Sequence, residues 1–499
     1  MVEIRPDLLD VLARRALTQD AARPEAVAKR HARGRTAREN IADLVDAGSF
    51  VEYGRFVTAA QEGRMSMDEL LDRTPADGLI GGIATVDGEP CAVLSYDYLV
   101  MAGTQGIRGH AKTDRLLRVI DRMRLPTVFF AEGGGGRPGD TDIPVVSALE
   151  VSTFALWARL AVPRIAIVAG RCFAGNAVIA GSSDLIIATA NSNLGMAGPA
   201  MIAGGGLGDV PAEAIGPIDV QTVSGVVDVA VEDEAEAVEV TRALLACASG
   251  SITAYETPDQ TILREAIPER DRVSYDVRLV IETLADEDSV IFLRERYGLE
   301  LVTAFARIEG RPVGVIANQT THTAGAITSD AAQKGARFLR LCEAWRLPVV
   351  SLVDTPGMMV GPDAEATGLV RHASDLIVAG ARLTVPLIGV VLRRGYGLGA
   401  QAMLGGGTHE PLITVAWPGA HLGPMGLEGA VRLGLRKEID ALPESEREAV
   451  VQEFTAVYQE RAKALNAARL NEIDDVIDPA ETRSVIAAVL RNASGNRAG

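Results

Sequence analysis

The chain carries nearly the same sequence twice, in two copies that lie about 222 positions apart. Three segments of the first copy recur in the second at offsets of 308 − 86 = 222, 346 − 124 = 222 and 385 − 162 = 223. They are VDGEP from Val86 and IEGRP from Ile308, RLPTVFF from Arg124 and RLPVVSLVD from Arg346, and VPRIAIVAGRCFAGNA from Val162 and VPLIGVVLRRGYGLGA from Val385. This period is far longer than the 20–50 residues of solenoids and propellers. Each copy is therefore predicted to be a whole domain.

The length of the chain supports the same division. A chain of 499 residues is too long for one ordinary hydrophobic core. We predict an N-terminal domain over residues 1–257 and a C-terminal domain over residues 258–499. The charged segment Pro258–Arg272 contains two prolines and is interpreted as the linker between them.

Short apolar runs alternate with helical patterns in both copies. The first copy predicts strands at Ala92–Val100, TVFF, IAIVAG and DLIIA, with helices at Asp114–Met123 and Val146–Leu160. The second predicts strands at VGVIAN, VVSLVD and LIGVVL, with helices at Ala331–Trp345 and Glu365–Ala379. Buried strands that alternate with helices indicate an α/β fold in which helices cover parallel sheets.

Composition narrows the class of protein. Apolar residues make up 47% and charged residues 23% of the chain, which is the balance of a globular protein. The net charge of −17 argues against a nucleic-acid-binding surface. No apolar leader and no run of 18 apolar residues is present, so we predict a soluble cytoplasmic protein with no membrane contact.

The cysteines and a basic cluster bear on possible metal, disulfide and anion sites. The four cysteines lie far apart and predict neither a disulfide framework nor a metal site: Cys91, Cys172, Cys247 and Cys342. A basic cluster near the N-terminus is either a site for a small anion or the solvated face of a helix. Its members are Lys29, Arg30, His31, Arg33, Arg35 and Arg38.

The most informative motif is a turn rich in glycine and alanine between a buried strand and a helix, present once in each copy. Such a turn lets a ligand approach the backbone, and the first N–H groups of the helix have no internal partner. The positive helix end also favours an oxygen that carries negative charge. We predict oxyanion donors at Ala174 and Gly175 in the first turn, and at Leu398 and Gly399 in the second. The alternative is tight helix–sheet packing, which the duplication makes less probable.

Neither turn supplies a nucleophile or a base. No serine lies in a GxSxG motif, and neither turn carries a histidine or a carboxylate. Cys172 lies near the first turn, but the second copy has Arg394 or Gly395 at that place, so a packing thiol is the better interpretation. Two oxyanion sites without a protein nucleophile indicate enolate chemistry on a thioester, with the base coming from elsewhere.

Other motifs are less specific. The glycine runs Gly133–Asp140 and Asp354–Gly357 follow predicted strands, where α/β sheets place ligands, but neither ends as a nucleotide phosphate loop does. Lys112 and Lys334 match across the repeat (334 − 112 = 222). Each is either a contact for a ligand phosphate or a lysine on a helix surface.

These motifs together resemble the carboxyltransferase (β) subunits of biotin-dependent acyl-CoA carboxylases, of the propionyl-CoA and acetyl-CoA carboxylase type, in the crotonase superfamily. The resemblance runs from about residue 30 to 490. It is carried by GRTAREN, TPADG, GRPVGVIANQ, DAAQKGARFLR, VDTPG with GLVRHASDLI, VPLIGVVLRRGYG and IDDVIDPAETR.

The resemblance implies two tandem crotonase-like domains (ββα spirals) related by internal duplication, with active sites shared between subunits of a homo-hexamer. One oxyanion hole would hold the enolate of an acyl-CoA and the other the ureido oxygen of carboxybiotin, whose released nitrogen acts as base. The chain has no AMKM-like biotinylation motif and no ATP-grasp domain. Carboxybiotin is therefore expected on a separate biotin carboxylase/biotin carboxyl carrier α subunit, and no bound metal is expected. Lys112, Lys334, Arg35 and Arg38 become candidates for the CoA phosphates.

The chain departs from the family at both turns. The usual CAGGA is CFAGN from Cys172, the usual AYGGAY is GYGLGA from Gly395, and the usual SGGARIQEG is EGGGGRPGD from Glu132. Residues at these departures are expected to shape the substrate pocket: Phe173, Asn176, Gln401, Gly133 and Gly134. The acyl group is left open, as are three other functions. These are a biotin-linked acyl-CoA decarboxylase subunit, a biotin-independent crotonase-like hydratase or hydrolase, and a catalytically altered structural paralogue in a carboxylase complex.

Overall fold

The computed structural model describes residues 5–137, 139–140, 149–270 and 272–495, and it divides into two compact units. The N-unit comprises residues 1–249 and the C-unit residues 250–499. The expected linker is part of the C-unit. Its segment Gln260–Arg264 forms a 3₁₀ helix whose Leu263 is only 1% exposed. The linker prediction was wrong because this short segment buries an apolar side chain in the core of the C-unit.

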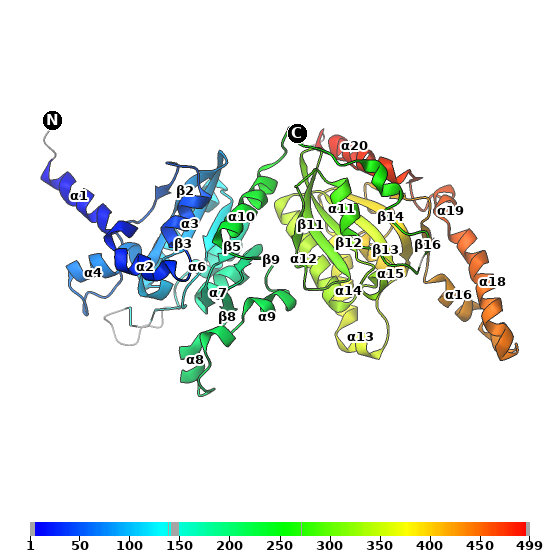
Figure 1. Ribbon diagram of the computed structural model, residues 1–499, viewed down its shortest axis with the longest axis horizontal. Coiled ribbons are helices and arrows are strands. Elements are labelled where there is room, and N and C mark those ends of the chain that lie inside the picture. Colours follow the sequence, from blue (N-terminus) through cyan, green and yellow to red (C-terminus); the bar gives the residue numbers. More distant parts are fainter. Residues whose placement is uncertain (1–4, 138, 141–148, 271, 496–499) are drawn as a thin grey trace. The chain divides into compact units, whose positions relative to one another are not determined.

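The N-unit is built on a seven-stranded sheet with the order β1-β2-β3-β4-β5-β7-β9 (Figure 1). The strands are β1 Val51–Glu52, β2 Leu79–Val86, β3 Glu89–Tyr96, β4 Thr127–Phe130, β5 Arg164–Val168, β7 Leu185–Thr189 and β9 Val229–Val231. β3, β4, β5, β7 and β9 run parallel, as predicted. A separate pair of short parallel strands, β6 Arg171–Phe173 and β8 Asn193–Gly195, leads into the first glycine turn.

The C-unit repeats this pattern in an eight-stranded sheet. The path runs β10-β11-β12-β13-β14-β15-β17, and β16 pairs with β14. The strands are β10 Ile291–Leu293, β11 Leu301–Ile308, β12 Arg311–Asn318, β13 Val349–Thr355, β14 Leu387–Tyr396, β15 Ile413–Ala416, β16 His421–Gly423 and β17 Asp475–Val476. β12, β13, β14 and β15 are parallel.

Each sheet contains an antiparallel hairpin that the prediction of purely parallel sheets did not include. β2 pairs antiparallel with β3, and β11 with β12. The turns between them are Asp87-Gly88 and Glu309-Gly310, with all four residues at positive φ (52°, 84°, 51° and 71°). A two-residue turn of this kind closes a hairpin, and the DG pair was a signal for it in the sequence.

Other unusual backbone positions recur at the same offset. Pairs with positive φ separated by 222 residues include Met101 and Thr323, Ala102 and Ala324, Arg124 and Arg346, and Gly135 and Gly357. A non-glycine residue with positive φ is uncommon, so its repetition at matching places shows that the two units share local backbone geometry as well as sequence.

Helices flank both sheets (Figure 1). Those of the N-unit are α1 Pro6–Leu17, α2 Pro24–His31, α3 Ala37–Leu44, α4 Met67–Arg73, α5 Ile107–Met123, α6 Thr153–Arg159, α7 Gly175–Gly181, α8 Pro199–Gly204, α9 Ile218–Val223 and α10 Glu234–Ser249. Those of the C-unit are α11 Arg278–Leu284, α12 Ser329–Trp345, α13 Pro362–Ala366, α14 Leu369–Ala381, α15 Gly397–Met403, α16 Leu427–Gly434, α17 Arg436–Asp440, α18 Glu444–Ala462, α19 Ala464–Arg469 and α20 Thr482–Gly495.

Three predicted helices differ in their bounds. The helix predicted over Asp114–Met123 begins earlier, at Ile107. The one predicted over Glu365–Ala379 is divided at Gly368, whose φ of 78° cannot continue a helix. The first residues of the one predicted over Val146–Leu160 lie outside the described residues, and the described helix α6 begins at Thr153.

Each unit has its own aromatic core beneath the sheet. In the N-unit, the rings of Phe129 and Trp157 meet edge to face, 5.5 Å apart. In the C-unit, Phe305 and Trp345 stack at 5.4 Å. Within the described part of the chain, no helix is both long and apolar enough to cross a bilayer.

Candidate active site

The first glycine turn joins β6 to α7 and exposes the start of that helix. Ala174 precedes the helix at φ 50° and ψ −121°, and Gly175 is the first helical residue. The Ala174 N–H donates to the Gly195 carbonyl at 3.1 Å and so extends the β6–β8 pairing. Among the described residues, the Gly175 N–H has no acceptor. Of the two predicted donors in this turn, Gly175 is therefore the one that is available to a ligand oxygen.

A glycine that was not among the predicted site residues lies beside this donor. A Cβ atom on Gly135 would lie 2.6 Å from the Cβ of Ala174 and 3.5 Å from the Gly175 nitrogen. A Cβ atom on Gly175 would lie 2.1 Å from Oε1 of Gln105. Glycine at both positions therefore allows two loops to meet the helix start. Only the spatial arrangement identifies Gly135, because it stands second to last in a run of four glycines.

Gly133 and Gly134, which were predicted to contact substrate, hold the loop in place. The Gly133 N–H donates to the Arg171 carbonyl at 2.7 Å, and its own carbonyl accepts from Phe173 at 2.9 Å. The Gly134 N–H donates to the Ala102 carbonyl at 3.2 Å. These bonds tie the loop after β4 to the strand that enters the turn.

Phe173 and Asn176 were also predicted to line the substrate pocket, and both side chains are buried. Phe173 is 3% exposed and packs beneath Gly195 and Gly198. Asn176 is fully buried, and its amide bonds only to backbone groups of the surrounding loops. Neither side chain faces solvent in this structure, so each shapes the turn from behind.

The second turn joins β14 to α15 and is built on the same plan. Gly397 has a φ of 57°, and Leu398 and Gly399 follow it at the start of the helix. Within the part of the chain that the structure describes, neither the Leu398 nor the Gly399 N–H has an acceptor. Gly399 packs against Gly357, with 2.6 Å from its would-be Cβ to the Gly357 carbonyl carbon. Gly357 corresponds to Gly135 (357 − 135 = 222). Both turns thus have a positive-φ glycine against the helix start.

Two side chains project from this second helix start. Leu398 is 62% exposed, and Gln401 is exposed one turn further along α15. Residues three positions apart lie on the same helix face, so Leu398 and Gln401 form one surface beside the donors. The predicted substrate-binding residue Gln401 is therefore accessible from solvent.

A buried carboxylate lies near the C-terminal end of the strand before each loop. Asp354 is fully buried and accepts from Nε of Arg393 at 2.9 Å and Nε of Arg394 at 2.6 Å. It also accepts from the Tyr275 hydroxyl at 2.9 Å. Its counterpart Glu132 (354 − 132 = 222) forms a bidentate pair with Arg30, at 2.8 and 2.7 Å. Burial raises the pKa of Glu132 to about 7, against the opposing effect of Arg30.

Cys172 has the environment of a packing residue. Its thiol is fully buried and donates to the Ala131 carbonyl at 3.1 Å. Burial raises the pKa of this thiol well above its usual value, which suppresses the reactive thiolate. Across the described ranges, no cluster of three histidine, cysteine or acidic residues could hold a metal ion.

The two matched lysines are buried, and their ammonium groups bond to backbone carbonyls of their own units. Lys112 is 7% exposed, and its ammonium donates to the carbonyls of Ala76 and Leu79. Lys334 is 3% exposed and donates to the carbonyls of Arg294 and Tyr297 at 2.9 and 3.0 Å. Burial lowers the pKa of Lys112 to about 8 and that of Lys334 to about 7. Each ammonium fastens its helix to the loop before the first long strand of its unit.

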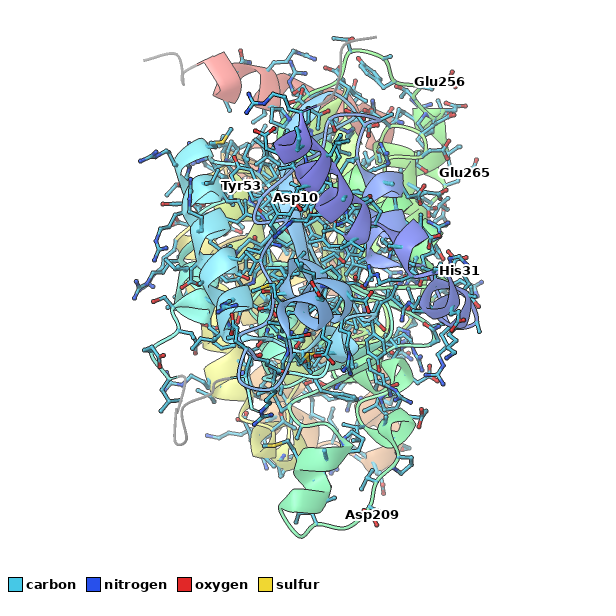
Figure 2. All side chains as sticks on the ribbon, turned by 90° about the vertical axis from the view of Figure 1, so that its left-hand side faces the viewer. Asp10, His31, Tyr53, Asp209, Glu256 and Glu265 are labelled. Atoms are coloured by element: carbon cyan, nitrogen blue, oxygen red, sulfur yellow. The ribbon has the colours of Figure 1, made fainter. Side chains whose placement is uncertain are left out.

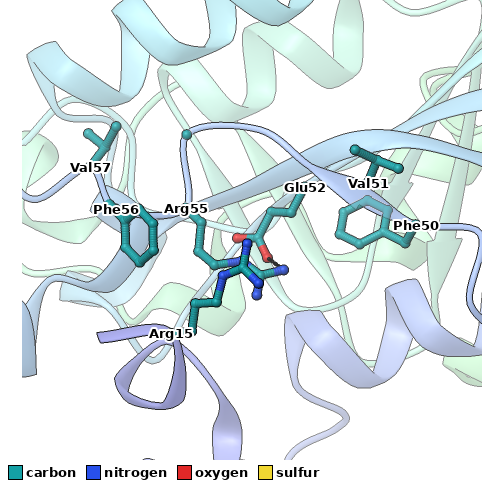
Figure 3. Close-up of a pocket in the computed structure, with 8 residues that line it drawn as sticks. Arg15, Phe50, Val51, Glu52, Arg55, Phe56 and Val57 are labelled. Atoms are coloured by element: carbon teal, nitrogen blue, oxygen red, sulfur yellow. Dashed lines mark ion pairs between the residues drawn. The ribbon is translucent and has the colours of Figure 1, made fainter. Parts of the chain in front are cut away.

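The basic cluster near the N-terminus is largely neutralised. Arg38 pairs with Glu52 at 3.2 Å, and Arg35 pairs with Asp43 at 2.5 Å. His31 lies at the surface and contacts Glu39 at 2.9 Å (Figure 2). Glu52 also pairs with Arg55 at the edge of an open pocket of about 650 Å³ (Figure 3). None of the residues that line this pocket belongs to either glycine turn. The Arg35 side chain is 38% exposed and that of Arg38 is 15% exposed, so Arg35 is the more accessible of the two arginines predicted to contact the CoA phosphates.

Comparison with known proteins gives one consistent result. Residues 29–497 match the family described as the carboxyl transferase domain. The chain is 33% identical over 477 residues to the methylmalonyl-CoA carboxyltransferase 12S subunit of Propionibacterium freudenreichii subsp. shermanii, covering 93% of this chain and 90% of that protein. It is 30% identical over 506 residues to the propionyl-CoA carboxylase beta chain of Roseobacter denitrificans, covering 98% and 97% of the two chains.

Two solved structures extend the comparison. One is described as a single-chain, multi-domain long-chain acyl-CoA carboxylase, with a TM-score of 0.92 and 52% identity over 97% of this chain and 49% of that chain. The present chain therefore spans about half the length of that protein. The other is a hexameric transcarboxylase 12S crystal structure with methylmalonyl-CoA and methylmalonic acid bound, with a TM-score of 0.86 and 30% identity. The match covers 99% of this chain and 96% of the chain in that structure.

Proposed function

The chain belongs to the carboxyl transferase domain family, and from that premise we propose that it moves a carboxyl group from carboxybiotin to the α-carbon of an acyl-CoA. One observation supports this proposal most directly. Each unit presents a strand–turn–helix in which a positive-φ glycine from a neighbouring loop lies against a helix start. Within the described residues, the N–H groups of Gly175 in the first turn and of Leu398 and Gly399 in the second have no acceptor. Two such sites suit a reaction in which two carbonyl oxygens carry negative charge in turn.

The chemistry needs little more than these donors. The N–CO₂ bond of carboxybiotin breaks, and the ureido oxygen takes up the negative charge at one turn. The biotin nitrogen accepts the proton from the α-carbon of the thioester, and the enolate oxygen is held at the other turn. The new C–C bond then forms between the α-carbon and the released CO₂. A donor of this kind stabilises an oxyanion by roughly 3–4 kcal/mol in a site from which water is excluded.

The architecture proposed for this reaction is a pair of crotonase-like units that arose by internal duplication. The shared hairpin turns, the matched positive-φ residues and the equivalent glycine contacts support it. Because one relative with a solved structure is a hexamer, we propose a homo-hexamer whose active sites lie between subunits. We also propose a cytoplasmic enzyme, since Cys91, Cys172 and Cys342 are buried thiols that form no disulfide in the described part of the chain.

The substrate and the partner are inferred from the relatives. The relative with 52% identity is described as a long-chain acyl-CoA carboxylase. We therefore propose a long-chain acyl-CoA as the first substrate to test, ahead of acetyl-CoA and propionyl-CoA. The carboxyl donor would be carboxybiotin on a biotin carboxylase/carrier partner.

The reverse reaction tests the function without knowledge of that partner. Purified protein is incubated with free biotin and a carboxylated acyl-CoA of short or long chain, and the loss of the carboxyl group is followed by mass spectrometry. We expect biotin-dependent decarboxylation, fastest for the long chain. Forward transfer is then measured with a biotin carboxylase–carrier protein, ATP and labelled bicarbonate. Absence of transfer in both directions, with an intact oligomer and bound CoA ester, would indicate an altered structural paralogue instead.

Two substitutions at one position isolate the donor of the first turn. Gly175→Ala and Gly175→Pro both add a Cβ atom against Gln105, but only proline removes the N–H. We expect the proline variant to lose a further 10²- to 10³-fold in kcat relative to the alanine variant. Equal activity of the two variants would exclude the Gly175 N–H as an oxyanion donor.

A further inference from the structure

Asn176 uses its whole side-chain amide to connect the segments that surround the first turn. Its Oδ1 accepts from the Gly135 N–H at 2.9 Å. Its Nδ2 donates to the carbonyls of Gly103 and Glu132, each at 3.3 Å. The residue itself is in the first turn of α7, next to Gly175, and is fully buried.

The bond to Gly135 has a specific geometric consequence. Gly135 is the residue whose backbone lies beside the Gly175 nitrogen, at φ 87°. The Gly135 carbonyl accepts from the Gln105 N–H at 2.7 Å, so the peptide groups on either side of this glycine are both fixed. Residues 133–136 are all glycine and have no side chains to pack, so hydrogen bonds and close backbone contacts hold this loop at that distance.

We propose that Asn176 is a positioning residue that sets the width of the first oxyanion turn by clamping Gly135 against it. The inference rests on the proposed function, in which the Gly175 N–H receives a substrate oxygen. Asn176 contacts no substrate itself. It fixes how closely an oxygen can approach the donor between Gly135 and Gly175, and a displacement of about 1 Å in such a site costs about 100-fold in rate.

In the C-unit a buried asparagine from a different element joins the equivalent loops, but Gly357, the counterpart of Gly135, donates its N–H to Oγ1 of Thr355 at 3.1 Å. There Asn318, at the end of β12, accepts from the Asp354 N–H at 3.2 Å and donates to the Gly325 carbonyl at 3.4 Å. Gly325 corresponds to Gly103 (325 − 103 = 222). A buried asparagine amide thus joins the equivalent loops in both units, although the two asparagines are not equivalent in sequence. The recurrence shows that both units join these loops through a side-chain amide that accepts and donates at the same time.

Asn176→Asp tests this requirement by pH. The aspartate still accepts from Gly135, but in its ionised form it faces the Gly103 and Glu132 carbonyls without a proton to donate. Burial raises the pKa of such a carboxyl, so lowering the pH protonates it and restores a donor. We expect kcat at pH 8 to fall at least tenfold with KM for the acyl-CoA changed less than threefold, and kcat relative to the wild type to recover as the pH falls to 6.

Asn193→Asp is the matched control. Asn193 is also buried in the N-unit and donates to two carbonyls, those of Glu213 and Ile215, at 3.2 and 3.3 Å. It has no bond to Gly135. We expect its activity relative to the wild type to show no recovery at low pH. The same pH profile for both aspartate variants would overturn the proposal that Asn176 holds Gly135 against the turn.

A second substitution leaves Asn176 in place. Gly135→Ala puts a methyl group 2.6 Å from the Cβ of Ala174 and forces the loop away from the turn. We expect a loss of kcat of at least tenfold, with the acyl-CoA KM again nearly unchanged. Full activity of Gly135→Ala would show that the spacing is not critical and would overturn the proposal.

Hydrogen exchange tests the positioning role of Asn176 independently of carboxyl transfer. In Asn176→Ala, peptides that cover residues 127–137 should exchange at least tenfold faster than in the wild type, whereas those from the C-unit should be unchanged. If the wild type transfers no carboxyl group, the proposed function fails, but this measurement still tests the clamp. Unchanged exchange in residues 127–137 would refute the clamp whatever the activity.

Discussion

A Cβ atom placed on Gly399 would lie 2.6 Å from the carbonyl carbon of Gly357, so the start of α15 meets the loop after β13 backbone to backbone. Gly399→Ala must therefore move one of two backbones, because no flexible side chain can give way. We expect this variant to lose about 1–3 kcal/mol of unfolding free energy and at least tenfold in kcat. Gly434→Ala, at a helical glycine with open space around it, is the control. A Gly399→Ala variant as active and stable as this control would contradict the close packing.

Leu398 occupies a position where the family that the chain resembles usually has glycine. Its side chain is 62% exposed beside the second pair of donors, so it narrows the approach to them without supporting the core. We expect Leu398→Gly to raise kcat/KM about threefold or more for whichever of free biotin and the acyl-CoA binds at this turn, and to cost no more than about 1 kcal/mol in stability. Chemical denaturation and the biotin-dependent reverse reaction measure the two effects. An unchanged kcat/KM would show that this side chain does not limit access.

Asp354 is the counter-ion of the buried Arg393 and of Arg394, whose side chain is 12% exposed. Asp354→Asn keeps the shape but leaves Arg393 and Arg394 without a counter-ion. Removing one partner of a buried pair costs about 3–5 kcal/mol, so we expect a large drop in unfolding free energy. Asp375→Asn breaks a partly exposed pair with Arg340 and should cost no more than about 1 kcal/mol. Similar losses for both variants would show that the Asp354 cluster is well solvated.

Lys334 predicts a pH dependence of stability. Its pKa, ordinarily 10.5, is lowered to about 7 in the folded chain, chiefly by burial and then by Arg294 and Arg278. The cost of the buried charge is fully present below pH 7. Between about pH 7 and 10.5 the unfolded chain keeps a proton that the folded chain has released, so the free energy of unfolding rises with pH.

The variant Lys334→Met has no titrating group at this position, so it lacks this pH-dependent contribution to the free energy of unfolding. We therefore expect the stability of the wild type relative to the variant to increase as the pH rises from 7 to 9.5, as measured by urea denaturation. The same comparison for the exposed Lys437→Met should show no such trend. A constant difference between wild type and Lys334→Met across this range would contradict the lowered pKa.

Several parts of the fold were predictable because they depend on local pattern. The apolar positions of Leu116, Leu117, Ile120 and Met123 predicted one helix face. The first three are buried in α5, whereas Met123, the last residue of the helix, is 49% exposed. The alternation of strands and helices predicted the parallel part of both sheets. The hairpins were not predicted because the buried strands were assumed to be parallel and the DG pair at Asp87-Gly88 was not interpreted as a hairpin turn.

The residues of the candidate site were less predictable. The two turns were located correctly as strand–helix junctions, but their side chains were assigned by analogy. Asn176 and Lys112 are polar residues that were predicted to contact the substrate or CoA, but both side chains donate to buried backbone carbonyls. Sequence spacing gives no information on which way such a side chain points, because that depends on loops more than 30 residues away.

The sequence by itself determined that this protein has two similar halves, each with a glycine turn between a buried strand and a helix. Those features follow from apolar periodicity and from the backbone freedom of glycine, which are local properties. Only the tertiary structure decided which N–H groups are available to a ligand. The Ala174 N–H donates to the Gly195 carbonyl, whereas the Gly175 N–H, beside Gly135, has no acceptor among the residues that the structure describes. That difference arises from the pairing of β6 with β8, which forms only when the chain has folded.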